Sequence, residues 1–142
     1  RSCAVAVFVF ANIKGIWYVL ANQRGKGCPD YQGYWNCPCG YVDYNETIRE
    51  AAYRELWEES MLNKSDVKLR QVGFNDNPND NKQNITFRLV GLIDTNSLPE
   101  IYCEFSEPDE IENLAWIPLA EIGIYDWAFN HDKLIFEMFR QL

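Results

Sequence analysis

Three glutamates within five residues are the first feature of this sequence that could do chemistry. Glu55, Glu58 and Glu59 lie in the run RELWEE, which begins at Arg54 inside a segment with the pattern of a helix. At about 100° per residue, Glu59 lies about 40° to one side of Glu55, and Glu58 lies about 60° to the other. A hard divalent cation such as Mg²⁺, which prefers oxygen ligands, removes the repulsion among them. The alternative is an exposed acidic helix face that Arg49 and Arg54 partly neutralise.

Residues upstream of this segment could complete a site. The stretch that ends at Gly40 leads into the helix, so backbone carbonyls and carboxylates can converge there. Arg24 is a candidate contact for phosphate, and Trp35 and Phe74 are candidates for stacking on a base. The alternatives are an ordinary loop position for Arg24 and places in the core for the two aromatic residues.

The pattern of the chain predicts strands and helices that would hold these groups. Apolar alternation and β-branched residues predict strands at residues 4–11, 16–21, 67–74, 85–93 and 114–117, with a short extended piece at 34–36. Helices are expected at 47–62, capped by Asn45 or Thr47, over one turn at 118–122, and at 129–142. Residues 22–33 and 75–84 are expected to be loops. Together, these strands and helices predict a mixed sheet with helices packed against it.

Length and composition indicate a single domain over residues 1–142. Hydrophobic residues make up 47% of the chain, and no apolar run approaches the roughly 20 residues that span a bilayer. The formal charge of −8 argues against a nucleic-acid polymer as the main partner. It allows a small phosphate substrate, because bound Mg²⁺ inverts the local field. Five cysteines without zinc-finger spacing favour reduced thiols and a cytoplasmic location.

The segment from residue 40 to residue 62 resembles the signature of the Nudix (MutT-like) hydrolases. Eight of nine defined positions match at the right spacing: Gly40, Glu46, Arg54, Glu55, Leu56, Glu58, Glu59 and Leu62. Met61 stands where the family has glycine. The expectation is that the helix continues to Leu62 and that Asn63 takes the left-handed conformation, which asparagine tolerates. Cys39 stands where many relatives have glycine, so the resemblance does not predict the shape of the loop that leads to Gly40.

The resemblance implies an α/β fold, a three-layer α/β/α sandwich with a mixed central sheet. It implies that Mg²⁺, or alternatively Mn²⁺, is held by Glu55, Glu58 and Glu59 with the carbonyl of Gly40. Arg54 would orient the carboxylates and Glu46 would be more structural, while Asp76 sits where the family often builds substrate contacts. The metal would activate water and neutralise phosphoryl charge.

An acidic stretch late in the chain resembles the family's acidic loop before a Trp-containing strand. Glu110, six residues before Trp116, is the first choice for a fourth carboxylate, with Glu107 second. The alternative is a solvated loop. His131 is the one histidine, and a cap or surface position is expected for it.

The expected activity is cleavage of a nucleoside diphosphate linked to another group, such as ADP-ribose, a dinucleotide or a sugar nucleotide. The alternatives are a nucleoside triphosphate pyrophosphatase of the MutT type and a Nudix-fold sensor domain that binds nucleotide without turnover. A prenyl diphosphate isomerase shares the fold, but the chain lacks a convincing Cys/His cluster for it. The substrate and the general base stay open, as does the oligomeric state, for which a homodimer is one option.

Overall fold

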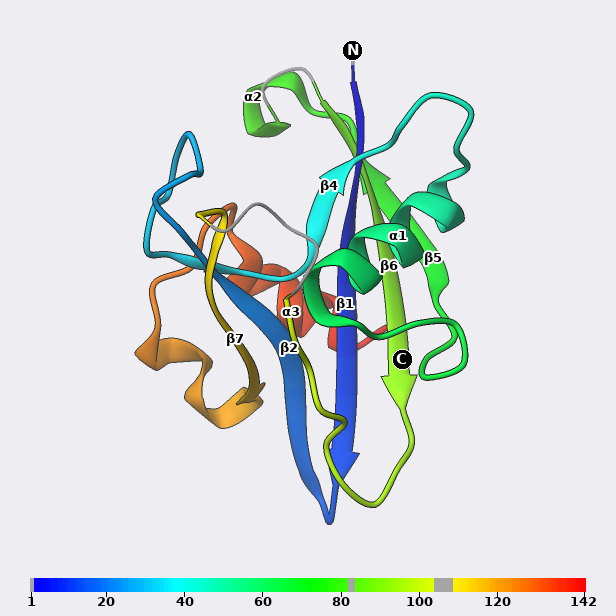
Figure 1. Cartoon of the computed structure of the whole chain (residues 1–142), viewed down its shortest axis with the longest axis vertical. Coiled ribbons are helices and arrows are strands. Elements are labelled where there is room, and N and C mark those ends of the chain that lie inside the picture. The colour runs from blue at the N-terminus through cyan, green and yellow to red at the C-terminus, as the bar shows by residue number, and fades with distance from the viewer. Residues whose placement is uncertain (1, 82–83, 104–108) are drawn as a thin grey trace.

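A mixed sheet with helices on both faces is the centre of the fold (Figure 1). The computed structural model describes residues 2–81, 84–103 and 109–142. Within these residues the strands are β1 (Cys3–Ile13), β2 (Ile16–Arg24), β3 (Trp35–Asn36), β4 (Cys39–Tyr41), β5 (Arg70–Asn75), β6 (Ile85–Ile93) and β7 (Ile111–Pro118). The helices are α1 (Ile48–Ser60), α2 (Pro78–Asn81), the 3-10 helix η1 (Leu119–Ile124) and α3 (His131–Phe139).

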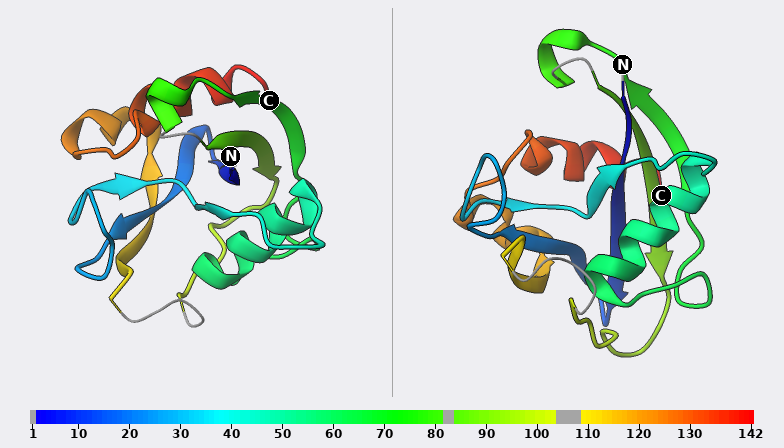
Figure 2. Two further views of the ribbon diagram at one scale, coloured as in Figure 1. Left: turned by 90° about the horizontal axis from the view of Figure 1, so that it is seen from above. Right: turned by 45° about the horizontal axis from the view of Figure 1, so that its top comes forward.

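The sheet runs in the order β3-β2-β1-β6-β5, with β4 also paired to β1 and β7 to β2. Strands β1 and β6 are parallel, and the other pairs are antiparallel. Side chains of β1 alternate between the two faces: Val5, Val7 and Val9 join the core under α1, whereas Phe8 and Phe10 join the core under α3. Figure 2 shows α1 and α3 on opposite sides of the sheet. The predicted three-layer α/β/α sandwich is confirmed.

Strand β1 changes its partner along one edge. Residues Ala4–Ala6 pair with β4, whereas Phe10–Ile13 pair with β2. Between these stretches the N–H of Val7 donates to the carbonyl of Pro38 at 2.8 Å. The sheet therefore forks at this edge, and β4 brings Gly40 beside α1.

Helix α1 begins at the cap that the sequence predicts. The Thr47 hydroxyl accepts from the Glu50 N–H at 3.1 Å, and the Glu50 carboxylate accepts from the Thr47 N–H at 3.0 Å. This reciprocal pair is a capping box, which satisfies two donors that the helix leaves unpaired. Thr47 rather than Asn45 is the N-cap.

The end of α1 corrects the expectation for Met61. The helix stops at Ser60, and Met61 itself takes the left-handed conformation with φ 66°, so Asn63 does not replace it. The Met61 N–H still donates to the carbonyl of Trp57 at 2.9 Å, which is the bond that a left-handed C-cap makes. The bond requires this backbone geometry whichever residue is present, and the signature's glycine supplies it without a Cβ penalty.

Replacing Met61 by Gly is therefore expected to raise the free energy of unfolding by about 1 kcal/mol. Urea denaturation would measure the change, with Met61→Ala as the control that shortens the side chain but keeps the Cβ. A gain of the same size in the alanine variant would show that the methionine side chain, rather than the backbone, is the source of strain.

The strand predicted at 67–74 begins only at Arg70. Val67 and Leu69 are buried, but their backbones bond to a side chain instead of a strand. The Tyr53 hydroxyl donates to the carbonyl of Val67 at 3.3 Å and accepts from the Leu69 N–H at 2.8 Å. A tyrosine on α1 thus replaces sheet pairing for this segment.

Other boundaries also differ from the prediction. Strand β2 continues to Arg24 because Asn22, Gln23 and Arg24 pair with β7, which itself runs from Ile111. The stretch 75–84, expected to be all loop, contains the short helix α2. Helix α3 begins at His131 rather than at 129. Among the described residues, no helix has the length and apolar character needed to cross a membrane.

Candidate active site

Arg54 joins the acidic residues of α1 into one network. One guanidinium nitrogen, Nη1, donates to Glu55 at 2.8 Å and to Glu58 at 3.3 Å. The other two nitrogens bond the Glu46 carboxylate in a fork, at 2.7 and 3.0 Å. Such bidentate pairs fix direction as well as charge, so Glu46 anchors Arg54 and Arg54 orients the helix carboxylates.

Further contacts tie this network to the chain before α1. Nη2 of Arg54 donates to the carbonyl of Tyr41 at 2.9 Å, and the Asp43 carboxylate lies 3.3 Å from its Nε. The Asp43 N–H donates to Glu46 at 2.9 Å. Hydrogen bonds from Arg54 are the main reason that the pKa of Glu46 is lowered. Arg54 thus fixes the loop between β4 and α1 against the helix.

Glu59 is the most unusual carboxylate of the site. Its Oε2 is buried and has no hydrogen-bond partner among the described residues. Burial raises the pKa of Glu59 well above its usual value, and the charges of Glu55, Glu58 and Glu110 raise it further. The backbone N–H of Cys39 opposes this shift. A buried oxygen without a partner is costly for folding alone, which points to a role that a ligand completes.

Gly40 lies against the carboxylate of Glu55. A Cβ placed on this glycine would overlap both oxygens and the carboxylate carbon. Burial raises the pKa of Glu55 to about 7, although the Arg54 guanidinium opposes the shift. The glycine of the signature is thus required by close approach of a carboxylate, since its φ is not positive.

Gly40→Ala is expected to lower hydrolytic activity by about tenfold or more while changing stability little. The added methyl meets the flexible end of a side chain, so Glu55 can move aside, but its carboxylate then leaves the position beside Gly40 from which it would bind a metal. Steady-state rates and urea denaturation would measure the two effects. Gly123→Ala is the matched control, because open space surrounds that glycine. Equal rates for both variants would contradict a role for the Glu55 position.

The oxygen atoms of these residues suit a hard cation, although the three helix glutamates do not converge on one point. Within the described part of the chain, no group of three His, Cys, Asp or Glu side chains is close enough to hold a metal ion. Glu55 and Glu58 are instead drawn toward Arg54. The unpartnered Oε2 of Glu59 and the carboxylate oxygens beside Gly40 are the ligands that Mg²⁺ prefers. The residues therefore fit a divalent metal in their chemistry.

A cleft of about 1040 Å³ opens beside these carboxylates. Glu59 and Gly40 line it, together with Glu110, which directly precedes β7. Arg24 also lines it and is held by Asp30, whose carboxylate accepts from the guanidinium at 2.7 Å. The Glu110 carbonyl accepts from the Gly25 N–H at 2.8 Å, which fixes this residue near Arg24. The structure thus brings Arg24, Glu59 and Glu110, three residues that the sequence analysis proposed for the site, to one cleft.

The sequence profile of the NUDIX domain matches residues 1–138. The chain belongs to the NUDIX domain family. The resemblance found in residues 40–62 is therefore confirmed and extends over nearly the whole chain.

Three comparisons place this Nudix domain among known proteins. An RNA pyrophosphohydrolase of Hydrogenovibrio crunogenus is 43% identical over 54 residues, which are 36% of this chain and 33% of that protein. The NUDIX domain of Shewanella oneidensis NrtR, solved with ADP ribose, has a TM-score of 0.81 at 20% identity, covering 99% of this chain and 88% of that one. An Ap4A hydrolase of Caenorhabditis elegans has a TM-score of 0.71 at 21% identity, covering 99% and 98%. The two structures show the shared fold, and the match to the first relative spans about a third of its length.

Three other residues that the sequence analysis proposed for the site are not among the lining residues of this cleft. Trp35 packs in the core under α3, with its ring 5.3 Å from that of Tyr125. Phe74 is exposed and lines a separate hollow beside α3. Asp76 follows β5 and is exposed. Glu107 lies outside the described residues. Of the described candidates, the cleft thus has Arg24, Gly40, Glu59 and Glu110 among its lining residues.

The structure also places residues in the cleft that the sequence analysis missed. They lie on β6, on the segment between β2 and β3, and just before or in α3: Thr86, Arg88, Tyr31, Phe129 and His131. The alternation of β6 could have found the first two, because Arg88 pairs with Ala6 and shares its face. The others depend on tertiary contacts, which local patterns do not encode.

His131 is buried, with 4% of its surface exposed, so the expected cap or surface position is wrong. Burial, reinforced by the charges of Arg88 and Arg24, lowers the pKa of His131 to about 3. Below pH 6.5 the unfolded chain binds a proton at this residue that the folded chain does not bind until about pH 3.

We expect stability to fall as the pH drops from 6.5 toward 3, with a contribution from His131 of up to about 1.4 kcal/mol per pH unit. Urea denaturation across this range would measure it. His131→Asn keeps an acceptor near Nδ1 but cannot titrate, so its curve should be flatter. Parallel curves for the two proteins would contradict the burial of a neutral imidazole.

Proposed function

We propose that this Nudix domain hydrolyses the diphosphate bond of a nucleoside diphosphate linked to a second group, in a reaction that requires Mg²⁺ or Mn²⁺. The observation that carries the proposal is the buried, unpartnered oxygen of Glu59 in the wall of a cleft that also holds Arg24 and Glu110. A folded protein gains nothing from such an oxygen, whereas a metal-dependent hydrolase needs it.

Glu55, Glu58 and Glu59 would hold the metal, with the carbonyl of Gly40. When bound, the metal supplies an activated water and neutralises charge that develops on the phosphoryl oxygens. Arg54 positions two of these carboxylates through Nη1 and is itself held by Glu46.

Two residues of the cleft would act on the substrate directly. Arg24 would bind a substrate phosphate with a guanidinium that Asp30 already orients. Glu110 is the candidate to take a proton from the attacking water, because it is near enough to Glu59 to affect its pKa.

The substrate is proposed from the comparisons as well as from the cleft. Similar folds have been solved with ADP ribose and in an Ap4A hydrolase, and a volume of about 1040 Å³ has room for such molecules. A small-molecule nucleotide is therefore the proposed partner. The absence of a nucleic-acid partner, a homodimer and a cytoplasmic location remain predictions.

Product release from a panel of nucleotides would test this function. The panel should hold ADP-ribose, diadenosine tetraphosphate, a sugar nucleotide, a nucleoside triphosphate and a 5′-triphosphorylated RNA, each with Mg²⁺, with Mn²⁺ and with EDTA. Turnover of one of the first three, abolished by EDTA, would support the proposal. Turnover of the triphosphate alone would indicate an enzyme of the MutT type, and turnover of RNA would overturn the predicted exclusion of nucleic acid. Binding without turnover would indicate a sensor domain.

A further inference from the structure

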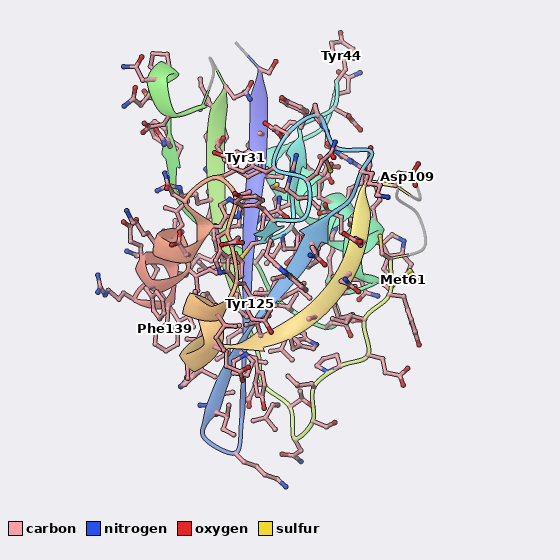
Figure 3. All side chains as sticks on the ribbon, turned by 90° about the vertical axis from the view of Figure 1, so that its left-hand side faces the viewer. Tyr31, Tyr44, Met61, Asp109, Tyr125 and Phe139 are labelled. Atoms are coloured by element: carbon pink, nitrogen blue, oxygen red, sulfur yellow. The ribbon has the colours of Figure 1, made fainter. Side chains whose placement is uncertain are left out.

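Two exposed aromatic residues line the cleft that Glu59 and Glu110 also line. Tyr31 lies between β2 and β3, and Phe129 lies just before α3 (Figure 3 labels Tyr31). Their ring centroids are 5.0 Å apart at an interplanar angle of 68°. The Arg24 guanidinium carbon lies 4.9 Å from the centre of the Phe129 ring. Tyr31 nevertheless remains 43% exposed and Phe129 39% exposed.

The backbone at both rings is in a conformation that bulky residues rarely adopt. Tyr31 has φ 48° and Phe129 has φ 58°, both in the left-handed region. Asn130, the next residue, also has φ 58°. Burial of apolar surface would be the ordinary compensation for this strain, but much of each ring is exposed. Strained positions of this kind cluster at ligand sites, so the exposed rings point to a ligand.

His131 adds a hydrogen-bond donor to this part of the cleft. Its Nδ1 accepts from the backbone N–H of Cys37 at 2.9 Å, so the neutral ring carries its hydrogen on Nε2. The ring lines the cleft, and its centroid is 5.7 Å from that of Phe129. Among the described residues, nothing accepts from Nε2. The bond to Cys37 thus fixes His131 as a donor for whatever occupies the cleft.

We propose that Tyr31, Phe129 and His131 form the subsite for the aromatic base of the nucleotide substrate. The base would pack on the two rings, and Nε2–H of His131 would donate to an acceptor atom on its edge. This inference rests on the proposed function, because it assigns the part of the substrate that lies beyond the phosphates. A flat base with ring nitrogens satisfies both features, whereas a sugar lacks the flat apolar face.

The position of the carboxylates in the same cleft supports this occupant. Glu59 and Gly40 lie in the wall that would hold the phosphates and metal, and Arg24 lines the cleft as well as contacting Phe129. One nucleotide could therefore reach the carboxylates with its phosphates and the aromatic rings with its base. Arg24 would lie between the phosphates and the base of that nucleotide.

The test is direct binding of mononucleotides, measured by titration calorimetry without turnover. The ligands are AMP, GMP, CMP and UMP, with ribose 5-phosphate as the matched ligand that lacks a base. Phe129→Leu should weaken binding of the preferred mononucleotide by about tenfold or more and leave ribose 5-phosphate unchanged. Phe136→Leu is the matched control, because Phe136 is a 42% exposed aromatic residue of α3 outside the described lining of the cleft.

Two replacements of His131 separate its role in binding from its role in folding. His131→Asn keeps an acceptor for the Cys37 N–H but removes the donor, so it should bind the mononucleotide about tenfold more weakly. His131→Gln places an amide donor near the position of Nε2 and loses the acceptor, so it should be less stable but bind more tightly than the asparagine variant. Thermal denaturation of both variants supplies the stability readout.

Two results would overturn the base subsite. One is equal affinity of wild-type protein for the mononucleotides and ribose 5-phosphate, and the other is an equal loss in Phe129→Leu and Phe136→Leu. If base-dependent binding is present but no member of the substrate panel is hydrolysed, the proposed function fails while the base subsite stands. If a member of the panel is hydrolysed but binding does not depend on the base, the base subsite fails while the proposed function stands.

Discussion

Glu59→Gln is expected to reduce metal-dependent hydrolysis by at least about a hundredfold, a loss of about 2.7 kcal/mol of transition-state stabilisation. The amide is nearly the same shape as the carboxylate but lacks the charge that a divalent cation needs. Rates of product release at saturating and limiting substrate would measure the loss.

The same variant should be no less stable than the wild type when metal is absent. Burial and neighbouring carboxylates raise the pKa of Glu59, so its ionised form weakens the metal-free fold as the pH rises above the value for an unfolded glutamate. Glutamine removes that cost. Addition of Mg²⁺ should raise the melting temperature of the wild type but have less effect on the variant.

Glu121→Gln is the control for Glu59→Gln, since it removes one carboxylate from the exposed surface of η1. It should leave the rate and the effect of Mg²⁺ unchanged. Retained activity in Glu59→Gln would place the reaction elsewhere in the protein.

Arg54→Met is expected to lower the free energy of unfolding by about 2 kcal/mol and to slow hydrolysis by tenfold to about a hundredfold. Methionine is of similar length but has no charge, so Glu46, Glu55 and Glu58 would lose their common partner. Removing one partner of a well-buried pair costs more, but the Arg54 side chain is 26% exposed and solvent screens part of the loss. Urea denaturation and steady-state kinetics would measure the two effects.

The pH dependence of stability tests whether ion pairs cause the loss in Arg54→Met. The pKa of Glu46 is lowered in the folded protein, so its pairing stabilises the fold above the usual glutamate pKa and is lost as the pH falls. Wild type and Arg54→Met should therefore converge in stability at low pH. Arg54→Lys keeps the charge but cannot form the fork, so it should recover stability better than activity. A constant difference at all pH values would contradict the ion-pair explanation.

The placement of the helix glutamates could be predicted because it depends on neighbours along one helix. The spacing of Glu55, Glu58 and Glu59 places them on one arc whatever the helix packs against. The capping box of Thr47 and Glu50 is equally local, and the structure contains it. Apolar alternation at residues 4–11 predicted a strand for the same reason, and the structure buries both faces of this strand.

Predictions failed where a distant contact outweighed the local pattern. Residues 67–69 have the apolar content of a strand, but the Tyr53 hydroxyl of α1 bonds the Val67 carbonyl and the Leu69 N–H. Met61 adopts a left-handed backbone that its own side chain disfavours, because α1 ends at Ser60, two residues earlier than the sequence suggests. Trp35, a candidate for stacking on a base, packs against Tyr125 beside the core, and its role in binding stays a prediction.

By itself the sequence determined the family, the alternating strands and a cluster of carboxylates suited to a divalent cation. These features follow from spacing of a few residues, for which backbone geometry alone sets the distances. The tertiary structure decided which side chains surround the carboxylates. It buried the oxygen of Glu59, brought Gly40 against Glu55, and placed Tyr31, Phe129 and His131 in one cleft. Those contacts join residues far apart in the chain, so they depend on sheet register and core packing rather than on any local pattern.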